Sequence, residues 1–204
     1  NYSGGHGGKG FRHWKGDGKT VNGSGVSITF PTDQKEFWIR WNMRYEAGFK
    51  WDNIITDKIL YIHTGVQSTD AILIHYGFNE MVIIAQGTTN YYQVRTGNVG
   101  WNQIQGGSVG DGNFHTYEVY LKMDTTGTDG VGRLWVDGVL RAENTHVDWS
   151  NNNTTARLGW KSVLVGSNQA TPSNGRCAYV DYDDIVVYNS TPPDIDTSGN
   201  AWIG

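Results

Sequence analysis

The chain has 204 residues, a formal net charge of −4 and 18% charged residues. This length suffices for one sizeable domain with a hydrophobic core. The acidic balance argues against non-specific binding to nucleic acid. No apolar run approaches the roughly 20 residues that a membrane-spanning helix needs. The composition therefore predicts one globular domain with no nucleic-acid partner and no membrane partner.

Glycine and aromatic residues are abundant, with 28 Gly, 9 Trp and 11 Tyr. Low charge combined with many glycines and aromatics is typical of an all-β protein with tight turns, often one that meets sugars. The single Cys177 excludes an internal disulfide and a cysteine-rich metal site. Residues 1–10 are neither Met-led nor signal-like, and we expect them to form a processed or trimmed end.

The hydrophobic pattern consists of short alternating runs separated by Gly, Asn and Asp, with almost no helical periodicity. Such runs at this spacing predict a sandwich of two antiparallel sheets. We predict one β-sandwich domain over 1–190 and a C-terminal tail over 191–204 that packs on its surface. The expected strands are 25–30, 35–51, 57–64, 71–77, 80–87, 91–96, 101–105, 115–123, 132–138, 139–145, 162–167 and 178–189.

The segment 35–51, KEFWIRWNMRYEAGFKW, has two very different faces, because successive side chains of a strand point to opposite sides. Phe37, Ile39, Trp41 and Met43 form an apolar face that must belong to the core. The opposite face is polar and aromatic, and Tyr61 and His63 share such a face in a later strand. We infer that one sheet carries a polar, moderately basic outer face. The polar set of the segment is Trp38, Arg40, Asn42, Arg44 and Glu46.

Two stretches resemble the concanavalin A-like lectin/glucanase superfamily. FHTYEVYLKMDTTGTDGVGRLWVDGVLRAE is similar to its back-sheet hairpin, and Asp137-Gly138 suits a type I′ turn. AYVDYDDIVVYN is similar to its last strand. The resemblance implies an all-β jelly-roll sandwich whose concave sheet binds a glycan. The paired carboxylates of the glycoside hydrolases, E-x-D-x-x-E, have no counterpart here, so a retaining glycosidase is disfavoured.

Three further stretches resemble family 7 alginate lyases, in the same chain order. IRWNMRYE corresponds to the Arg-rich strand, LYIHTG to the Q-I-H strand and LGWKSVLVGSNQ to the late strand. Tyr61 stands where that family has Gln, and the late Tyr of the family is missing. A relative similar to heparin lyases or glucuronan lyases remains open. The resemblance implies a secreted polysaccharide lyase, extracellular or periplasmic and monomeric, whose partner is a polysaccharide.

β-Elimination of a uronate polysaccharide needs a group that neutralises the C5 carboxylate, a base and an acid. We predict Arg40 and Arg44 for the carboxylate, because guanidinium groups bind carboxylates with two hydrogen bonds. His63 is the predicted base, since imidazole titrates near neutral pH. Tyr61, or Tyr91 on another strand, is the predicted acid. The predicted substrate-binding residues are Trp38, Asn42, His75, Gln86, Gln93, Arg95, Trp101 and Lys161.

A structural calcium ion is a further expectation, because the superfamily often places one at the back sheet and hard cations prefer oxygen ligands. Its predicted ligands are Asp17, Asp181, Asp183 and Asp184. The competing interpretation is that these aspartates form caps and turns, and it is slightly favoured. No other cofactor is expected.

Two alternatives to a lyase remain open at this point. A non-catalytic carbohydrate-binding module or lectin of the same fold would have an aromatic groove without a converging base and acid. A structural or adhesive surface protein would use the same face to bind another chain.

Overall fold

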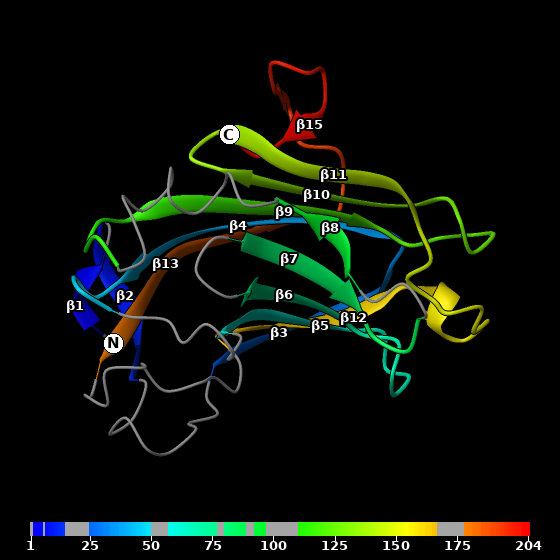
Figure 1. The fold of residues 1–204 in the computed structure, drawn as a ribbon, viewed down its shortest axis with the longest axis horizontal. Helices are drawn as coiled ribbons and strands as arrows, with labels where there is room; N and C mark the ends of the chain where they lie inside the picture. The colour runs from blue at the N-terminus through cyan, green and yellow to red at the C-terminus, as the bar shows by residue number, and fades with distance from the viewer. Residues whose placement is uncertain are drawn as a thin grey trace.

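The computed structural model describes residues 2–5, 7–14, 25–49, 57–76, 80–88, 92–96, 110–166 and 178–204. Two large sheets pack face to face as a jelly-roll β-sandwich (Figure 1), and their strand pairings are antiparallel. The seven-stranded sheet contains, from edge to edge, Tyr2–Gly5 (β1), Gly8–Trp14 (β2), Tyr179–Tyr188 (β13), Glu36–Tyr45 (β4), His115–Lys122 (β9), Gly130–Val136 (β10) and Val139–Val147 (β11). The six-stranded sheet contains Val26–Gln34 (β3), Trp160–Val165 (β12), Asp57–His63 (β5), Ala71–Tyr76 (β6), Glu80–Ala85 (β7) and Tyr92–Arg95 (β8).

The core lies between the sheets and is built from alternate residues of their strands. On β4, the four residues predicted to face the core are completely buried: Phe37, Ile39, Trp41 and Met43. They pack in one apolar cluster with residues of both sheets, including Ile62 of β5. Removal of this apolar surface from water stabilises the sandwich by about 25 cal/mol per Å². The predicted core face is confirmed.

The hairpin between β10 and β11 forms as its sequence predicts. Asp137 and Gly138 have φ values of 50° and 74°, and Val136 pairs with Val139 across them. A two-residue turn with two positive φ angles matches the right-handed twist of its strands. The strands β9, β10 and β13 all lie in the seven-stranded sheet, so the two superfamily-like stretches belong to one layer.

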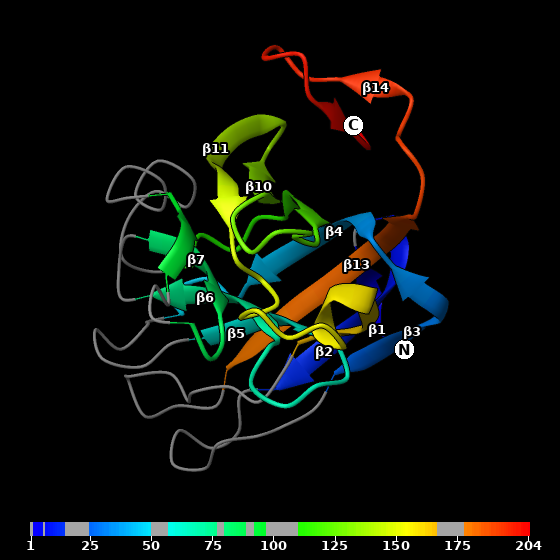
Figure 2. The ribbon, with the colours of Figure 1, turned by 90° about the vertical axis from the view of Figure 1, so that its right-hand side faces the viewer.

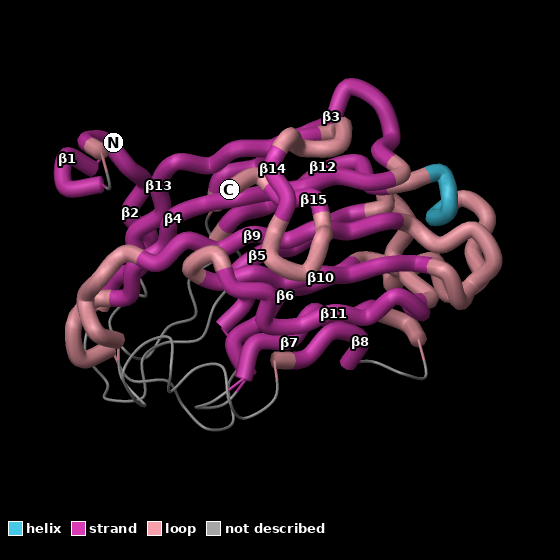
Figure 3. The backbone as a smooth tube through the Cα atoms, turned by 90° about the horizontal axis from the view of Figure 1, so that it is seen from above, coloured by secondary structure: helices cyan, strands magenta, loops and turns pink. Residues whose placement is uncertain are grey.

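The C-terminal segment forms a small hairpin on the outer side of the seven-stranded sheet, where Figures 1 and 2 show it in red. Its strands are Asp194–Ile195 (β14) and Ala201–Trp202 (β15), and they cross over the sheet when seen from above (Figure 3). One short 3-10 helix, Ala156–Leu158 (η2), precedes β12. In the described ranges, no helix is long and apolar enough to span a membrane.

Several elements differ from the sequence-based expectation. The glycine-rich strands β1 and β2 were not predicted, because their glycines hide the alternation of side chains. The hairpin β14–β15 was also not predicted, because each of its strands has only two residues and so shows no periodicity. The strand expected at 101–105 lies outside the described residues.

Candidate functional site

The antiparallel register of β5 and β6 brings a histidine and an aspartate together on the six-stranded sheet. Ile62 pairs with Ala71, so the next residues outward along the two strands, His63 and Asp70, face each other. Nδ1 of His63 lies 3.1 Å from Oδ2 of Asp70, and the Thr64 backbone N–H donates to Oδ1 of Asp70 at 3.1 Å. A carboxylate at this position favours the tautomer in which Nδ1 carries the proton, and in that tautomer Nε2 is the accepting nitrogen.

The second ring nitrogen of His63 is left accessible. The His63 side chain is 38% exposed, and within the described ranges Nε2 has no hydrogen-bond partner. Asp70 is 8% exposed, so its carboxylate is held in place beside the ring. A carboxylate at one imidazole nitrogen fixes the orientation of the ring and stabilises the imidazolium that forms when the other nitrogen takes a proton.

Tyr61 lies on the same outer face, two residues before His63. Its ring stacks on the imidazole with the centroids 4.5 Å apart and the planes at 29°. Its hydroxyl donates to Oε1 of Gln86 at 3.0 Å. Gln86 is in turn fixed by its backbone N–H, which donates to the Asp70 carbonyl at 2.9 Å. Tyr61, His63, Asp70 and Gln86 therefore form one connected group, which we call the His63 cluster.

Cationic side chains flank the His63 cluster. Gly65, in the loop that follows β5, has φ +81°, and a Cβ atom added there would lie 2.7 Å from Cδ and 3.1 Å from Nζ of Lys161. The Lys161 side chain therefore lies against this loop. Nζ of Lys58 lies 5.5 Å from the centroid of the Tyr61 ring. These lysines place positive charge beside the His63 cluster, and positive charge attracts anionic ligands.

Beyond Tyr61, the outer face of the six-stranded sheet becomes apolar. Ile72 pairs with Tyr61 on β5 and with Ile84 on β7, and Ile74 pairs with Val82. These four aliphatic side chains form a buried cluster against which Tyr61 packs. The cluster supports one side of Tyr61 and limits its rotation.

Four of the predicted site residues lie on the other sheet, which corrects the expectation that one face carries them all. Trp38, Arg40, Asn42 and Arg44 belong to β4 of the seven-stranded sheet, whereas His63 belongs to β5 of the six-stranded sheet. Alternation along a strand shows which residues share a face, but not which sheet the strand joins. The predicted convergence of the two arginines with His63 is therefore wrong.

Arg44 is held by a buried aspartate. Oδ2 of Asp181 accepts hydrogen bonds from Nε and Nη2 of Arg44 at 3.0 and 2.7 Å. Arg12 donates to both carboxylate oxygens of Asp181 from the other side, at 2.7 and 3.0 Å. The Asp181 side chain is completely buried. This triad ties β2, β13 and β4 together.

Trp38 is buried under the C-terminal segment and lines no open groove. It is 3% exposed, stacks on Tyr120 at 4.3 Å between ring centroids and donates from Nε1 to the Ala201 carbonyl at 3.0 Å. Beside it, Oε1 of Glu118 accepts from the Ile203 backbone N–H at 2.7 Å. Burial raises the pKa of Glu118 to about 7, although this backbone hydrogen bond opposes the rise.

The remaining predicted substrate residues are scattered or lie outside the description. Arg95 forms a bidentate pair with Glu80, with two contacts of 2.7 Å. Gln93 is 7% exposed and lies on β8, three strands from β5. For His75, the structure describes only its position on β6. Tyr91, Trp101 and Asp17 lie outside the described residues.

The predicted calcium ligands do not form a metal site within the described ranges. There, no group of three or more His, Cys, Asp or Glu side chains is arranged to hold a metal ion. The Asp181 carboxylate lies between two guanidinium groups, which does not fit a calcium ligand. Oδ2 of Asp184 accepts from Nδ2 of Asn42 at 2.9 Å, and Oδ1 of Asp183 accepts from the Asp184 backbone N–H at 2.9 Å. Because Asp17 is not described, a calcium ion stays a prediction.

Sequence reasoning missed Asp70. The residue directly precedes the strand AILIHY, seven positions after His63. An antiparallel hairpin formed by the expected strands 57–64 and 71–77 would place Asp70 opposite His63. This register was the sequence feature that could have identified Asp70.

Comparison with known proteins establishes the fold. No family model and no curated protein matches the chain. Among solved structures, alginate lyase Aly36B variants in complex with an alginate trisaccharide and an alginate tetrasaccharide have TM-scores of 0.63 and 0.62, at 14% and 13% identity. Each match covers 87% of this chain and 80% of the lyase. The fold is thus the jelly roll found in polysaccharide lyases, as the sequence resemblance predicts.

A second similar structure is that of a toxin. A structure of botulinum neurotoxin type C, whose cell entry depends on interaction with two ganglioside molecules, matches with a TM-score of 0.53 at 11% identity. The match covers 89% of this chain and 43% of that one. The same sandwich therefore occurs both in a polysaccharide-cleaving enzyme and in a toxin that interacts with glycolipids.

Proposed function

We propose that the protein is a polysaccharide lyase that cleaves a uronate-containing polysaccharide by β-elimination on the outer face of the six-stranded sheet. The observation that carries this proposal is the His63 cluster, in which a carboxylate-oriented imidazole with an accessible Nε2 lies in stacking contact with a tyrosine. The similarity in fold to alginate lyase Aly36B bound to alginate oligosaccharides supports the same substrate class.

The residues of the cluster suit each step of the reaction. Nε2 of His63 removes the proton from C5, and the electron pair left behind forms the C4=C5 double bond as the C4–O4 bond breaks. The Tyr61 hydroxyl protonates the departing O4, and the proton on His63 returns to the phenolate through solvent. Atoms and charge then balance, because the C5–H and C4–O4 bonds break while the C4=C5 π bond and the O4–H bond form.

The substrate carboxylate must be neutralised while the C5 proton leaves. In the described ranges, the groups suited to this task are Lys161 and the Gln86 amide nitrogen, whose carboxamide is oriented by the hydrogen bond from Tyr61 to Oε1. They replace the arginine clamp that the sequence suggested. Preorganised donors of this kind stabilise charge that develops in the transition state.

The test is near-ultraviolet absorbance after the protein is mixed with alginate, glucuronan, heparin-type glycans, pectate or neutral glucans, with and without calcium. Elimination leaves a conjugated double bond, whereas hydrolysis does not. We expect a rise in absorbance with one uronate polymer and none with neutral glucans. Silence across the whole panel would refute the proposed lyase.

The second candidate is a carbohydrate-binding module of the same fold. The observation that favours it is the position of Arg40 and Arg44, because both predicted carboxylate-binding guanidinium groups lie on the opposite sheet. Binding of a uronate polymer without a rise in absorbance, measured by titration calorimetry on the same panel, would select this function.

A further inference from the structure

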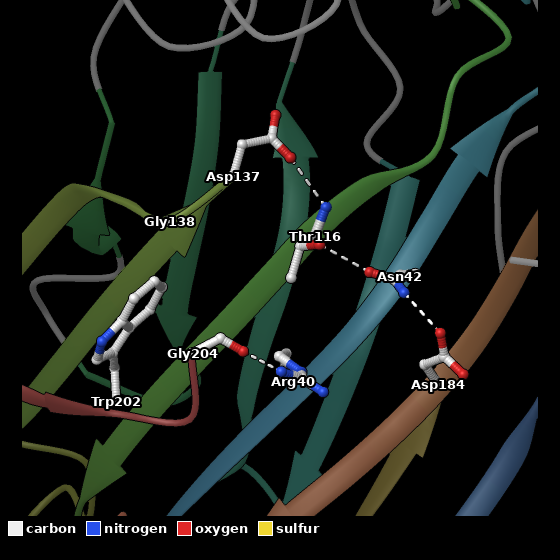
Figure 4. Close-up of a pocket in the computed structure, with 8 residues that line it drawn as sticks. All are labelled: Arg40, Asn42, Thr116, Asp137, Gly138, Asp184, Trp202 and Gly204. Carbon is white, nitrogen blue, oxygen red and sulfur yellow. Dashed lines mark hydrogen bonds between the residues drawn. The ribbon is translucent and has the colours of Figure 1, made fainter. Parts of the chain in front are cut away.

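A hollow of about 300 Å³ lies on the outer face of the seven-stranded sheet, on the opposite side of the sandwich from the His63 cluster. Three elements contribute: neighbouring strands of the sheet, the β10–β11 turn and the C-terminal segment (Figure 4). The lining residues are Arg40, Asn42, Thr116, Asp137, Gly138, Asp184, Trp202 and Gly204.

The floor of the hollow is an ordered chain of hydrogen bonds across three strands. Thr116 on β9 donates from Oγ1 to Oδ1 of Asn42 on β4 at 2.8 Å, and Nδ2 of Asn42 donates to Oδ2 of Asp184 on β13 at 2.9 Å. The register of β13 shifts between Asp183 and Val186, and Asp184 has φ +48°. A bulge re-aims a side chain, and here it directs Asp184 toward Asn42.

A second carboxylate lies across the hollow at the hairpin turn. Oδ1 of Asp137 accepts from the Thr116 backbone N–H at 3.0 Å, and Oδ2 lies 2.7 Å from Nδ1 of His115. Burial tends to raise the pKa of Asp137, but the hydrogen bonds from His115 and Thr116 outweigh it and hold the pKa below its usual value. Asp137 is therefore an ionised acceptor at neutral pH.

Arg40 supplies donors in the same hollow, to one side of the hydrogen-bonded chain that runs from Asp137 to Asp184. One guanidinium nitrogen, Nη1, donates to the Gly204 carbonyl, and within the described ranges its other nitrogens have no hydrogen-bond partner. The hollow thus presents one guanidinium donor and two hydrogen-bonded carboxylates, and each carboxylate oxygen has more than one acceptor site, so a ligand with hydroxyl groups can add further hydrogen bonds.

One wall of the hollow is the indole of Trp202, which lies against the turn. A Cβ atom added at Gly138 would come within 3.1 Å of the Trp202 ring, so the absence of a side chain at this position lets the ring approach. The hydrogen bonds from Trp38 to the Ala201 carbonyl and from the Ile203 backbone N–H to Glu118 hold the segment on either side of Trp202. The wall is consequently part of a built structure.

We propose that this hollow binds one neutral pyranose unit of an oligosaccharide, with Trp202 against the apolar face of the sugar ring. Vicinal hydroxyl groups both donate and accept, which matches Asp137, Asp184 and Arg40. An aromatic ring with a few precisely placed polar groups is the usual form of a small-ligand site. Among the residues that line the hollow, two carboxylates and one guanidinium are charged, which disfavours an anionic sugar, so this site selects a different class of glycan from the His63 cluster.

Calorimetric titration with the hexaoses of cellulose, laminarin, xylan and mannan tests this inference, with a uronate hexamer and a chitosan hexamer as charged comparisons. We expect a neutral hexaose to bind and the uronate hexamer to show no binding that depends on this hollow. Asp184→Asn, which tolerates the positive φ, and Trp202→Ala should each lower the affinity at least tenfold. Trp14→Ala removes an exposed indole at the other end of the same sheet and should leave the affinity unchanged.

The inference is overturned if no neutral hexaose binds, if the charged hexamers alone bind, or if Asp184→Asn and Trp202→Ala both bind as the wild type does. Because both variants lie on the seven-stranded sheet side, they should retain elimination activity at the His63 cluster. Loss of the neutral site and loss of the lyase function are therefore distinguishable outcomes.

Discussion

The outer faces of the two sheets use their charged residues differently. On the seven-stranded sheet, the buried carboxylate of Asp181 is shared between Arg12 and Arg44, whereas on the six-stranded sheet His63 has a carboxylate at one ring nitrogen and leaves the other accessible. Arg44 on β4 and His63 on β5 lie on strands with similar patterns of polar residues. The carboxylate that two guanidinium groups bind ties strands of the fold together, whereas the chemistry that we propose uses a ring nitrogen that is still accessible.

The largest expected effect is on the stability that the seven-stranded face provides. Asp181→Ala should lower the free energy of unfolding by about 3–5 kcal/mol, because it leaves two partly buried guanidinium groups without their carboxylate. Urea denaturation measures the loss. Asp33→Ala, at an exposed position on β3, is the control and should stay within about 0.5 kcal/mol of the wild type. A loss below about 1 kcal/mol for Asp181→Ala would contradict the structural role of the triad.

The next effect concerns the carboxylate that orients His63. Asp70→Asn should lower kcat/KM on the uronate polymer about 100-fold, or about 2.7 kcal/mol, because the amide no longer favours the Nδ1–H tautomer and the imidazolium. Its oxygen can still accept from the Thr64 backbone N–H, so the fold should persist. Asp33→Asn is the control for a carboxylate on the same sheet. Unchanged turnover in Asp70→Asn would separate His63 from the chemistry.

The pH dependence of stability should reveal the buried Glu118 under the C-terminal segment. Its folded pKa is raised from 4.5 to about 7, so the folded state holds the proton more tightly than the unfolded state. The free energy of unfolding should therefore fall by about 2.6 kcal/mol as the pH rises from about 4.5 to about 7. Glu118→Gln should flatten this part of the profile. A wild-type stability that rises over the same range, with no difference from Glu118→Gln, would contradict the raised pKa.

The smallest expected effect is at Lys161. Lys161→Met should raise KM about tenfold, equivalent to about 1.4 kcal/mol, because it removes a charge beside the His63 cluster while keeping most of the side-chain length. Steady-state kinetics at two salt concentrations measures it, and the salt dependence of KM should weaken in the variant. Lys122→Met, an exposed lysine on β9 of the other sheet, should leave KM unchanged. Equal effects of the two substitutions would show that the charge acts non-specifically.

The sequence predicts much of the fold because its strands have clear two-residue periodicity. The core face of β4 and the Asp137-Gly138 turn follow from local chemistry, namely alternation and the positive φ that a type I′ turn requires. Local chemistry does not predict which sheet β4 joins, because strand pairing depends on contacts between residues far apart in sequence. For the same reason, Arg40 and Arg44 were grouped with His63.

Sequence predicts only the part of the candidate site that comes from residues close together on one strand. Tyr61 and His63 share a face because they are two residues apart on one strand, and that grouping required nothing beyond periodicity. Asp70 could be found only from the register of a hairpin. Gln86 was predicted to bind substrate, but its place beside Tyr61 follows only from the pairing of β6 with β7. The burial of Trp38 depends on a C-terminal segment 163 residues away along the chain, which no local pattern indicates.

The most direct test of the account compares His63→Ala with Arg44→Gln on the uronate polymer that gives an absorbance rise with the wild type. Both variants are assayed at a temperature at which circular dichroism shows them folded. We expect His63→Ala to lower kcat/KM at least 100-fold, because a general base is removed, and Arg44→Gln to stay within about threefold of the wild type. The reverse result, with His63→Ala active and Arg44→Gln inactive, would place the chemistry on the seven-stranded sheet and contradict the account.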